Sequence, residues 1–328
     1  MKQPQLINRL SLRRQFDRRA ESIANADFLL REIERRAFER LDYIKLQPQV
    51  ILDVGCGQGK GTMKLAQRFV QAQVIGMDQS PAMIAGCQRR YQAPTATTNG
   101  LKSLANTVKR WLPSAKQASP QPVGQSIQWM CADSHQIPLP DASVDLIWSN
   151  CAMHWFADPR EVIAQWRRIL RPNGLLMFTS FGVQTLQELS ALGAVLPTFQ
   201  DMHDIGDQMQ NQKFAEPVMD METLHFTYQH AADVLRDVRA IGGNAIGTNA
   251  AVASLNSAIL GDDSSVASAF VANHAKGLRG RALKQQILAN LVSVDCLTFE
   301  IVYGHAWAPA QKRLPEGYSP IEFRPRGG

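Results

Sequence analysis

Short runs of consecutive apolar residues alternate along much of the chain with longer stretches in which apolar residues recur every three or four positions. The runs predict strands buried on both faces, and the stretches predict amphipathic helices. Strands that alternate with helices in this way are typical of a parallel sheet covered by helices. The predicted strands are 50–54, 74–78, 127–132, 144–149 and 175–179, and the predicted helices are 26–42, 61–70, one that starts with Ser80 as N-cap and Pro81 in its first turn, and 159–170.

Two segments interrupt this alternation. Residues 93–125 are rich in Pro, Ser, Thr and Gln and contain basic residues but no acidic one, which predicts a flexible insertion. Residues 182–291 are rich in Ala, Met, Gln and Asp and predict helices added after the fifth strand, among them one over 231–241. The apolar run 297–303 predicts the last strand.

We therefore divide the chain into four parts. They are an N-terminal helical cap (1–47), a ligand-binding core (48–182) that contains the insertion at about 93–125, a lid together with the sixth strand (183–293), and the final strand with a C-terminal tail (294–328).

Composition and charge narrow the class of protein. A hydrophobic content of 45% over 328 residues excludes a collagen-like or disordered chain, and a net charge of +6 suggests an acidic partner but falls short of a nucleic-acid-binding arm. The sequence contains no run of eighteen apolar residues, so we expect no membrane-spanning helix. The five cysteines form no CxxC pair, so we expect neither a disulfide framework nor a metal site. We expect a cytoplasmic protein, or a mitochondrial matrix protein if the source is eukaryotic, because the N-terminus is rich in arginine.

A glycine-rich turn follows the first predicted strand. Gly55, Gly57 and Gly59 permit positive φ angles and let the backbone lie directly against a ligand. The spacing is not the GxGxxG of dinucleotide-binding proteins, because Lys60, Thr62 and Lys64 stand at the third-glycine positions. It is not a P-loop either.

Polar residues end the next strands. Asp78 ends the second strand, Asp133 and Ser134 follow the third, and Asn150 follows the fourth. A single Asp in such a place is often only a helix N-cap. A series of them at one edge of a parallel sheet instead predicts a ligand site, in which Asp78 has the position of the carboxylate that binds an adenosine ribose.

These motifs together resemble the class I S-adenosylmethionine-dependent methyltransferases. The resemblance is carried over about residues 48–182 by the stretches DVGCGQG (53–59), ADS (132–134), IPLPDASVDLI (137–147) and LRPNGL (170–175). It implies an α/β, doubly wound, Rossmann-like sheet of seven strands, with the last hairpin antiparallel and a helical lid after strand five. It also implies S-adenosylmethionine as cofactor, with the glycines against its methionine and ribose, Asp78 on the ribose hydroxyls and Asp133 on the adenine amino group. The full implied set is Asp53, Gly55, Gly57, Gly59, Asp78, Gln79, Asp133, Ser134 and Asn150.

Flanking segments narrow the resemblance to the malonyl-[acyl-carrier protein] O-methyltransferases of biotin biosynthesis. These segments are FDRRA (16–20), WSNCAMHW (148–155) and LRDVRAIG (235–242). The implied reaction is methylation of the free malonyl carboxylate at the early pimeloyl stage. One position departs from the family pattern, since Ile23 stands where these enzymes usually carry a tyrosine.

Other functions remain open at this stage. The protein-arginine hydroxylases related to a complex I assembly factor share the fold and the His154–Trp155 pair, and they resemble FGVQTLQEL (181–189) somewhat better. A non-enzymatic binding or assembly protein on the same fold is also possible, because fold does not determine chemistry. The failed GxGxxG spacing argues against an oxidoreductase that uses NAD.

The expected chemistry needs no general base, because a carboxylate is already ionised near neutral pH. Candidates for the acceptor site are Trp148, Asn150, His154 and Trp155, although ordinary core packing is an equally good explanation for Trp148 and a more common one for His154. The basic residues expected to dock an acidic carrier protein form two clusters, Arg13, Arg14, Arg18 and Arg19 near the N-terminus and Lys276, Arg279, Arg281 and Lys284 in the lid.

Overall fold

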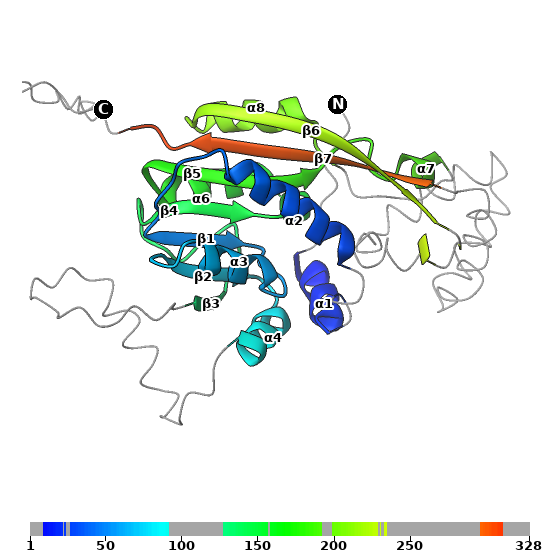
Figure 1. The fold of residues 1–328 in the computed structure, drawn as a ribbon, viewed down its shortest axis with the longest axis horizontal. Coiled ribbons are helices and arrows are strands. Elements are labelled where there is room, and N and C mark those ends of the chain that lie inside the picture. The colour runs from blue at the N-terminus through cyan, green and yellow to red at the C-terminus, as the bar shows by residue number, and fades with distance from the viewer. Residues whose placement is uncertain are drawn as a thin grey trace, which may run out of the picture.

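A computed structural model describes residues 9–21, 23, 27–91, 127–156, 158–191, 199–228, 230, 233–234 and 296–310. Its strands form one seven-stranded sheet with the order β3-β2-β1-β4-β5-β7-β6 (Figure 1). The strands are β1 (Val50–Val54), β2 (Gln73–Asp78), β3 (Ile127–Cys131), β4 (Val144–Ser149), β5 (Leu170–Phe181), β6 (Ala215–Thr227) and β7 (Cys296–Trp307). The first five run parallel, and β7 pairs antiparallel with both β5 and β6. The predicted doubly wound sheet with antiparallel last strands is confirmed.

The described helices follow the predicted order. They are α1 (Arg9–Arg19), α2 (Phe28–Leu41), α3 (Lys60–Arg68), α4 (Pro81–Tyr91), α6 (Pro159–Ile169), α7 (Gln187–Ala191), α8 (Met202–Asn211) and the 3-10 turn η2 (Met153–Trp155). The predicted start of α4 is confirmed, because the Ser80 hydroxyl accepts a hydrogen bond of 3.2 Å from the backbone N–H of Met83. None of the described helices is long and apolar enough to cross a membrane.

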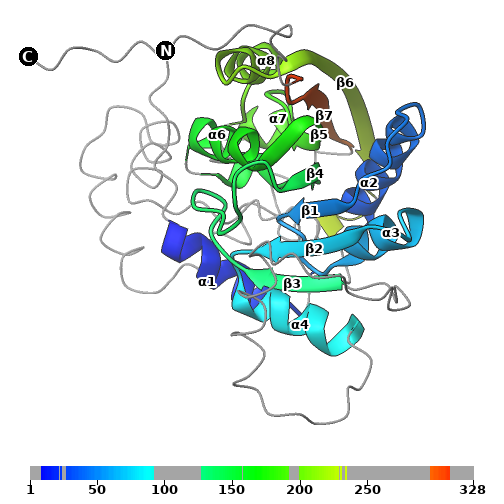
Figure 2. The same ribbon diagram turned by 90° about the vertical axis from the view of Figure 1, so that its left-hand side faces the viewer.

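Helices cover both faces of the sheet (Figure 2). The stripe Leu29, Ile33, Ala37 and Leu41 of α2 packs with α3 over one face, beside the buried Trp148 of β4. On the other face α6 and α8 cover β1, β4 and β5. Both faces of the central strands are largely apolar, and this leaves the ends of these strands as the places open to polar ligands.

The sixth strand lies within the segment 183–293 in which it was expected, although no residues had been assigned to it. Residues 215–227 form this strand, β6, an edge strand on which partly buried and exposed side chains largely alternate. Its partner β7 lies more than sixty residues later in the chain, so a local sequence pattern cannot predict that the two strands pair. Ion pairs connect β6 to α2: Arg40 lies 2.5 Å from Asp220 and 3.9 Å from Glu222, and Arg36 also pairs with Glu222.

The predicted helical lid is only partly described. Helix α8 belongs to the core rather than to a lid, because Ile205 and Met209 are fully buried against the sheet. The insertion 93–125, all but two residues of the predicted helix 231–241 and the second basic cluster lie outside the described residues.

Candidate functional site

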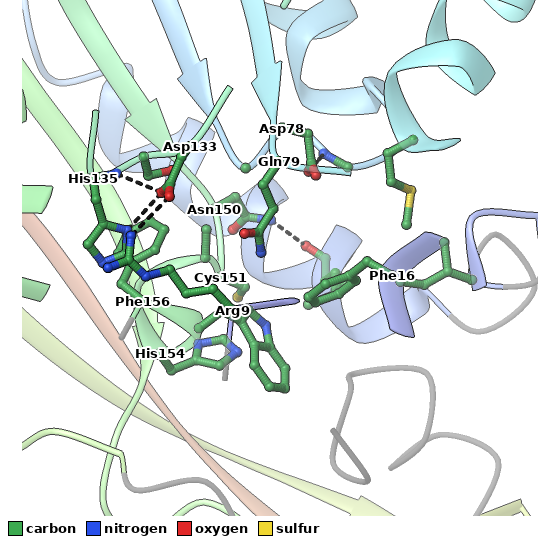
Figure 3. A pocket seen from close by; sticks show the side chains of 18 residues that line it. Arg9, Phe16, Asp78, Gln79, Asp133, His135, Asn150, Cys151, His154 and Phe156 are labelled. Carbon is green, nitrogen blue, oxygen red and sulfur yellow. Dashed lines mark hydrogen bonds and ion pairs between the residues drawn. The ribbon is translucent and has the colours of Figure 1, made fainter. Parts of the chain in front are cut away.

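A pocket opens at the carboxyl ends of the parallel strands, where α1 and α2 approach the sheet (Figure 3). Its empty volume, the solvent at its mouth included, is about 870 Å³. Its walls come from the glycine turn, from the ends of β2, β3 and β4, from η2 and from the N-terminal helices. The pocket thus lies at the edge of the sheet where the sequence predicted a ligand site.

The glycine turn presents its backbone to this pocket. Gly55 has a φ of +74° and lies so close to Ala152 that a Cβ atom would approach the Ala152 methyl to 2.6 Å. Gly57 has a φ of +51°, and a Cβ atom there would meet nothing within 4 Å. Both glycines line the pocket. At Gly57 the open space is a place where a ligand can lie against the main chain.

Asp78 holds the turn in place from the end of β2. One carboxylate oxygen accepts a hydrogen bond of 3.0 Å from the backbone N–H of Gly57, and the other accepts one of 2.8 Å from Ser80. Burial raises the pKa of Asp78 to about 6. The carboxylate is therefore largely ionised near neutral pH, beside an open cavity, with Gln79 next to it in the lining.

Asp133 lies across the pocket and is already paired. It accepts hydrogen bonds from the backbone N–H and the ring Nδ1 of His135, at 2.9 and 2.8 Å, and forms an ion pair of 3.1 Å with Arg9 of α1. Burial raises the pKa of Asp133, but the hydrogen bonds from His135 and Arg9 outweigh this effect and lower the pKa below its ordinary value. Ser134 also lines the pocket.

Two residues expected to contact the cofactor lie beneath the turn instead of in the pocket lining. Asp53 is buried, accepts a hydrogen bond of 2.6 Å from the Thr62 hydroxyl, and has a pKa that burial raises to about 7. Gly59 leaves room for the ring of Trp129, which a Cβ atom would overlap. Asp53 and Gly59 thus support the glycine turn on the side that faces away from the pocket.

Of the four residues predicted for the acceptor site, three line the pocket and one does not. Trp148 does not line the pocket, because it is fully buried and its ring stacks on Phe38 with centroids 4.5 Å apart. Asn150, His154 and Trp155 do line it. The Asn150 amide donates to the Leu30 carbonyl at 3.2 Å, and its oxygen accepts from the Thr179 hydroxyl at 2.7 Å, so this side chain joins β4 to α2 and β5.

Helix α1 closes one side of the pocket. The ring of Phe16 packs edge-on against Trp155 with centroids 5.5 Å apart, and Asp17 accepts a hydrogen bond of 2.6 Å from the Ser80 hydroxyl. Ile23, which replaces the usual tyrosine, also lines the pocket. Phe16 and Asp17 lie in the FDRRA motif, which could have identified them as site residues. Arg9 and His135 carried no such sequence pattern.

Comparisons with known proteins agree with this geometry. Two family models, each described as a methyltransferase domain, match residues 51–110 and 102–178. The malonyl-[acyl-carrier protein] O-methyltransferase of Methylovorus sp. (strain MP688) is 36% identical, with 98% of this chain and 96% of the relative covered. The protein of that name from Gallionella capsiferriformans (strain ES-2) is 34% identical, with 97% of each chain covered.

A solved structure shares the fold at low sequence identity. It is the methyltransferase in complex with the Trm112 activator of Haloferax volcanii, with a TM-score of 0.52, 13% identity, and coverage of 92% of this chain and all of that one. Similarity to curated relatives along almost the whole chain is the stronger evidence. The chain belongs to the malonyl-[acyl-carrier protein] O-methyltransferase family, whose members are S-adenosylmethionine-dependent methyltransferases.

Proposed function

We propose that this protein methylates the free carboxylate of a malonyl group carried by an acyl-carrier protein, at the early pimeloyl stage of biotin biosynthesis. The observation that carries the proposal is the similarity to relatives of that name over almost the whole chain. The pocket supports it, because its charged groups cluster at the cofactor end and aromatic rings surround the other end.

The described residues fit S-adenosylmethionine. The open space against Gly57 accommodates a ligand beside the main chain, and the ionised Asp78 is a suitable acceptor for two ribose hydroxyls. Asp133 is proposed to receive the adenine amino group, in exchange for its present contact with Arg9. Gly55, Gln79, Ser134 and Asn150 complete the proposed set from the lining.

Methyl transfer to a carboxylate requires the protein to align the two reactants and exclude water, and it does not require an acid or a base. When bound, the cofactor supplies a methyl carbon that bonds to a carboxylate oxygen as its bond to sulfur breaks and the electron pair stays on sulfur. The malonyl carboxylate is ionised already, so no side chain has to remove a proton. Phe16, Ile23 and Trp155 wall the acceptor end and exclude water, and alignment of this kind is worth about 7–11 kcal/mol in favourable cases.

Helix α1 is the proposed docking surface for the carrier protein. Arg13, Arg14 and Arg18 are exposed and form no ion pair with any described residue, and Arg19 is half-buried on the same helix. The helix closes the pocket, so an acidic partner bound there would bring its acyl group to the opening. Arg279 and Arg281, outside the described residues, remain part of the proposal. We also propose a cytoplasmic location, since all five cysteines are free thiols.

The test is an assay with S-adenosylmethionine and malonyl-acyl-carrier protein, read by intact-protein mass. We expect a gain of one methyl group on the carrier and none on acetyl-acyl-carrier protein. No gain on the malonyl form would refute the proposal and favour a hydroxylase or an assembly factor.

Docking is tested by charge reversal and salt. Arg14→Glu should lower kcat/KM for the carrier-bound substrate several-fold at low salt and leave it unchanged for a small malonyl thioester, because exposed charges act through screened attraction. Lys45→Glu makes the same change of charge on an exposed residue before β1, at the opposite end of the sheet, and should have no effect. Equal losses in both variants would contradict docking on α1.

A further inference from the structure

The acceptor end of the pocket contains few polar side chains that are free to bind a substrate. Both groups of the Asn150 amide are used, as described above. The backbone N–H of Cys151 donates to the Thr179 hydroxyl at 2.9 Å, and the Cys151 thiol lies 3.5 Å from the same hydroxyl. These groups hold the loop after β4 together and leave His154 and Trp155 as the candidates.

His154 is buried, yet its polar atoms have no partner among the described residues. Only 7% of the residue is exposed, and Nδ1 is sealed from solvent without a hydrogen bond. Its ring lies among aromatic rings, with centroids 4.8 Å from both Trp155 and Phe181 and 5.9 Å from Phe199. A polar ring that is left unpaired in apolar surroundings costs free energy, so a site that retains one needs a reason for it.

The ring is neutral. Burial lowers the pKa of His154 to about 3, and no described carboxylate contacts it. A neutral imidazole has one N–H and one bare nitrogen. An orphaned buried backbone N–H is rarer than an orphaned acceptor, and by the same reasoning we assign the proton to Nε2 and leave the sealed Nδ1 bare. His154 lines the pocket (Figure 3), and with this assignment its Nε2 is a hydrogen-bond donor.

We propose that the Nε2–H group of His154 binds the malonyl carboxylate through the oxygen that is not methylated. The inference rests on the proposed function, and it adds the atom that recognises the acceptor. The hydrogen bond orients the carboxyl plane and leaves the second oxygen free to face the methyl carbon. It thus assigns to His154 the role of acceptor-binding residue.

A neutral donor suits this reaction better than a cation. A lysine or arginine in contact with the carboxylate would stabilise its negative charge and weaken the attacking oxygen, and it would also repel the positively charged cofactor. A neutral N–H fixes the geometry with a smaller change in charge. It also favours malonyl over acetyl groups, because an acetyl group has no carboxylate and would leave the donor unpaired.

The test compares variants that separate the donor from the ring. His154→Phe keeps an aromatic ring among aromatic neighbours and removes the N–H, and we expect kcat/KM for the malonyl substrate to fall about 10- to 100-fold with cofactor affinity unchanged. His154→Gln places an amide N–H at a similar reach and should recover a large part of the loss. His203→Phe, the same substitution at an exposed histidine of α8, should have no effect.

Two outcomes would overturn the inference alone while the wild-type enzyme remains active. One is full activity of a folded His154→Phe variant. The other is a large loss in Trp155→Phe without a loss in His154→Phe, which would assign the donor to the indole. If wild-type protein adds no methyl group to the malonyl carrier, the proposed function fails, and this inference fails with it.

A measurement on wild-type protein covers the case in which the Phe variant does not fold. Nitrogen NMR of histidine-labelled protein, with S-adenosylhomocysteine and a malonyl thioester bound, should show His154 neutral and protonated on Nε2 from pH 5 to 8. The Nε2–H resonance should move when the thioester is added and stay in place for an acetyl thioester. A proton on Nδ1, or no response to the malonyl group, would overturn the inference.

Discussion

Replacement of Asp78 by asparagine should weaken cofactor binding strongly while it leaves the fold nearly as stable. The side chain contacts both the glycine turn and the start of α4, since Gly57 and Ser80 donate to its two oxygens at 3.0 and 2.8 Å. Asp78→Asn keeps the size of the group and one acceptor oxygen. It removes the negative charge on which the ribose hydroxyls are expected to depend.

The two effects can be estimated separately. The pKa of Asp78 is about 6 against an ordinary 3.8, so the ionised carboxylate destabilises the unliganded fold by about 3 kcal/mol at pH 7.5. The asparagine removes this cost but turns its NH2 group towards one backbone N–H, which costs about 1–3 kcal/mol. These terms nearly cancel. Hydrogen bonds from the ribose to a charged acceptor are worth about 1.5–3 kcal/mol, which corresponds to roughly a 10- to 100-fold loss of affinity.

Titration calorimetry with S-adenosylhomocysteine and thermal denaturation of the unliganded protein measure the two effects. We expect a Tm within a few degrees of wild type and the loss of affinity given above. Asp204→Asn, the same change on the exposed surface of α8, should alter neither quantity. Unchanged affinity in a folded Asp78→Asn variant would refute the placement of the ribose at Asp78.

The same carboxylate predicts a dependence on pH. Wild-type affinity should decrease as the pH falls through about 6, because protonation removes the charged acceptor, and Asp78→Asn should show no such decrease. For stability the sign is opposite. Between pH 3.8 and 6 the folded protein keeps a proton that the unfolded chain has lost, so the contribution of Asp78 to stability falls as the pH rises through this window. Parallel affinity profiles for wild type and variant would contradict this assignment.

Three further substitutions test the glycine turn and helix α1. Gly59→Ala should lower the free energy of unfolding by about 2–4 kcal/mol, because a φ of +76° and the ring of Trp129 both oppose a Cβ atom. Gly57→Ala should mainly reduce cofactor affinity, because a Cβ atom there meets only open space. Equal effects of the two variants on denaturation would contradict this distinction. Arg9→Ala should change stability by less than about 1 kcal/mol, because the pair with Asp133 is half-exposed, and should raise cofactor affinity a few-fold at low salt. Lower affinity in this variant would mean that Arg9 assists binding.

Continuous apolar runs and turn residues made much of the fold predictable. The strands 50–54 and 144–149 were predicted to the residue, because a strand buried on both faces is apolar at most of its positions. Gly55 and Gly57 were predicted to face a ligand because few other residues accept their backbone angles. Strand β6 was expected within 183–293 only from the family resemblance, and its residues were not predicted, because an edge strand is only half-buried and its partner β7 is distant in sequence.

The sequence alone determined which strand ends carry polar groups, and hence where the pocket lies. Only the tertiary structure decided which of these groups face the pocket. Asp53 and Gly59 belong to the same motif as Gly55, but they do not line the pocket. Asp53 accepts a hydrogen bond from Thr62, and Gly59 packs against the ring of Trp129. Arg9 reaches Asp133 across 124 residues of chain. The physical reason is that a local pattern reports which residues prefer burial, whereas contacts with distant segments determine what each buried group meets.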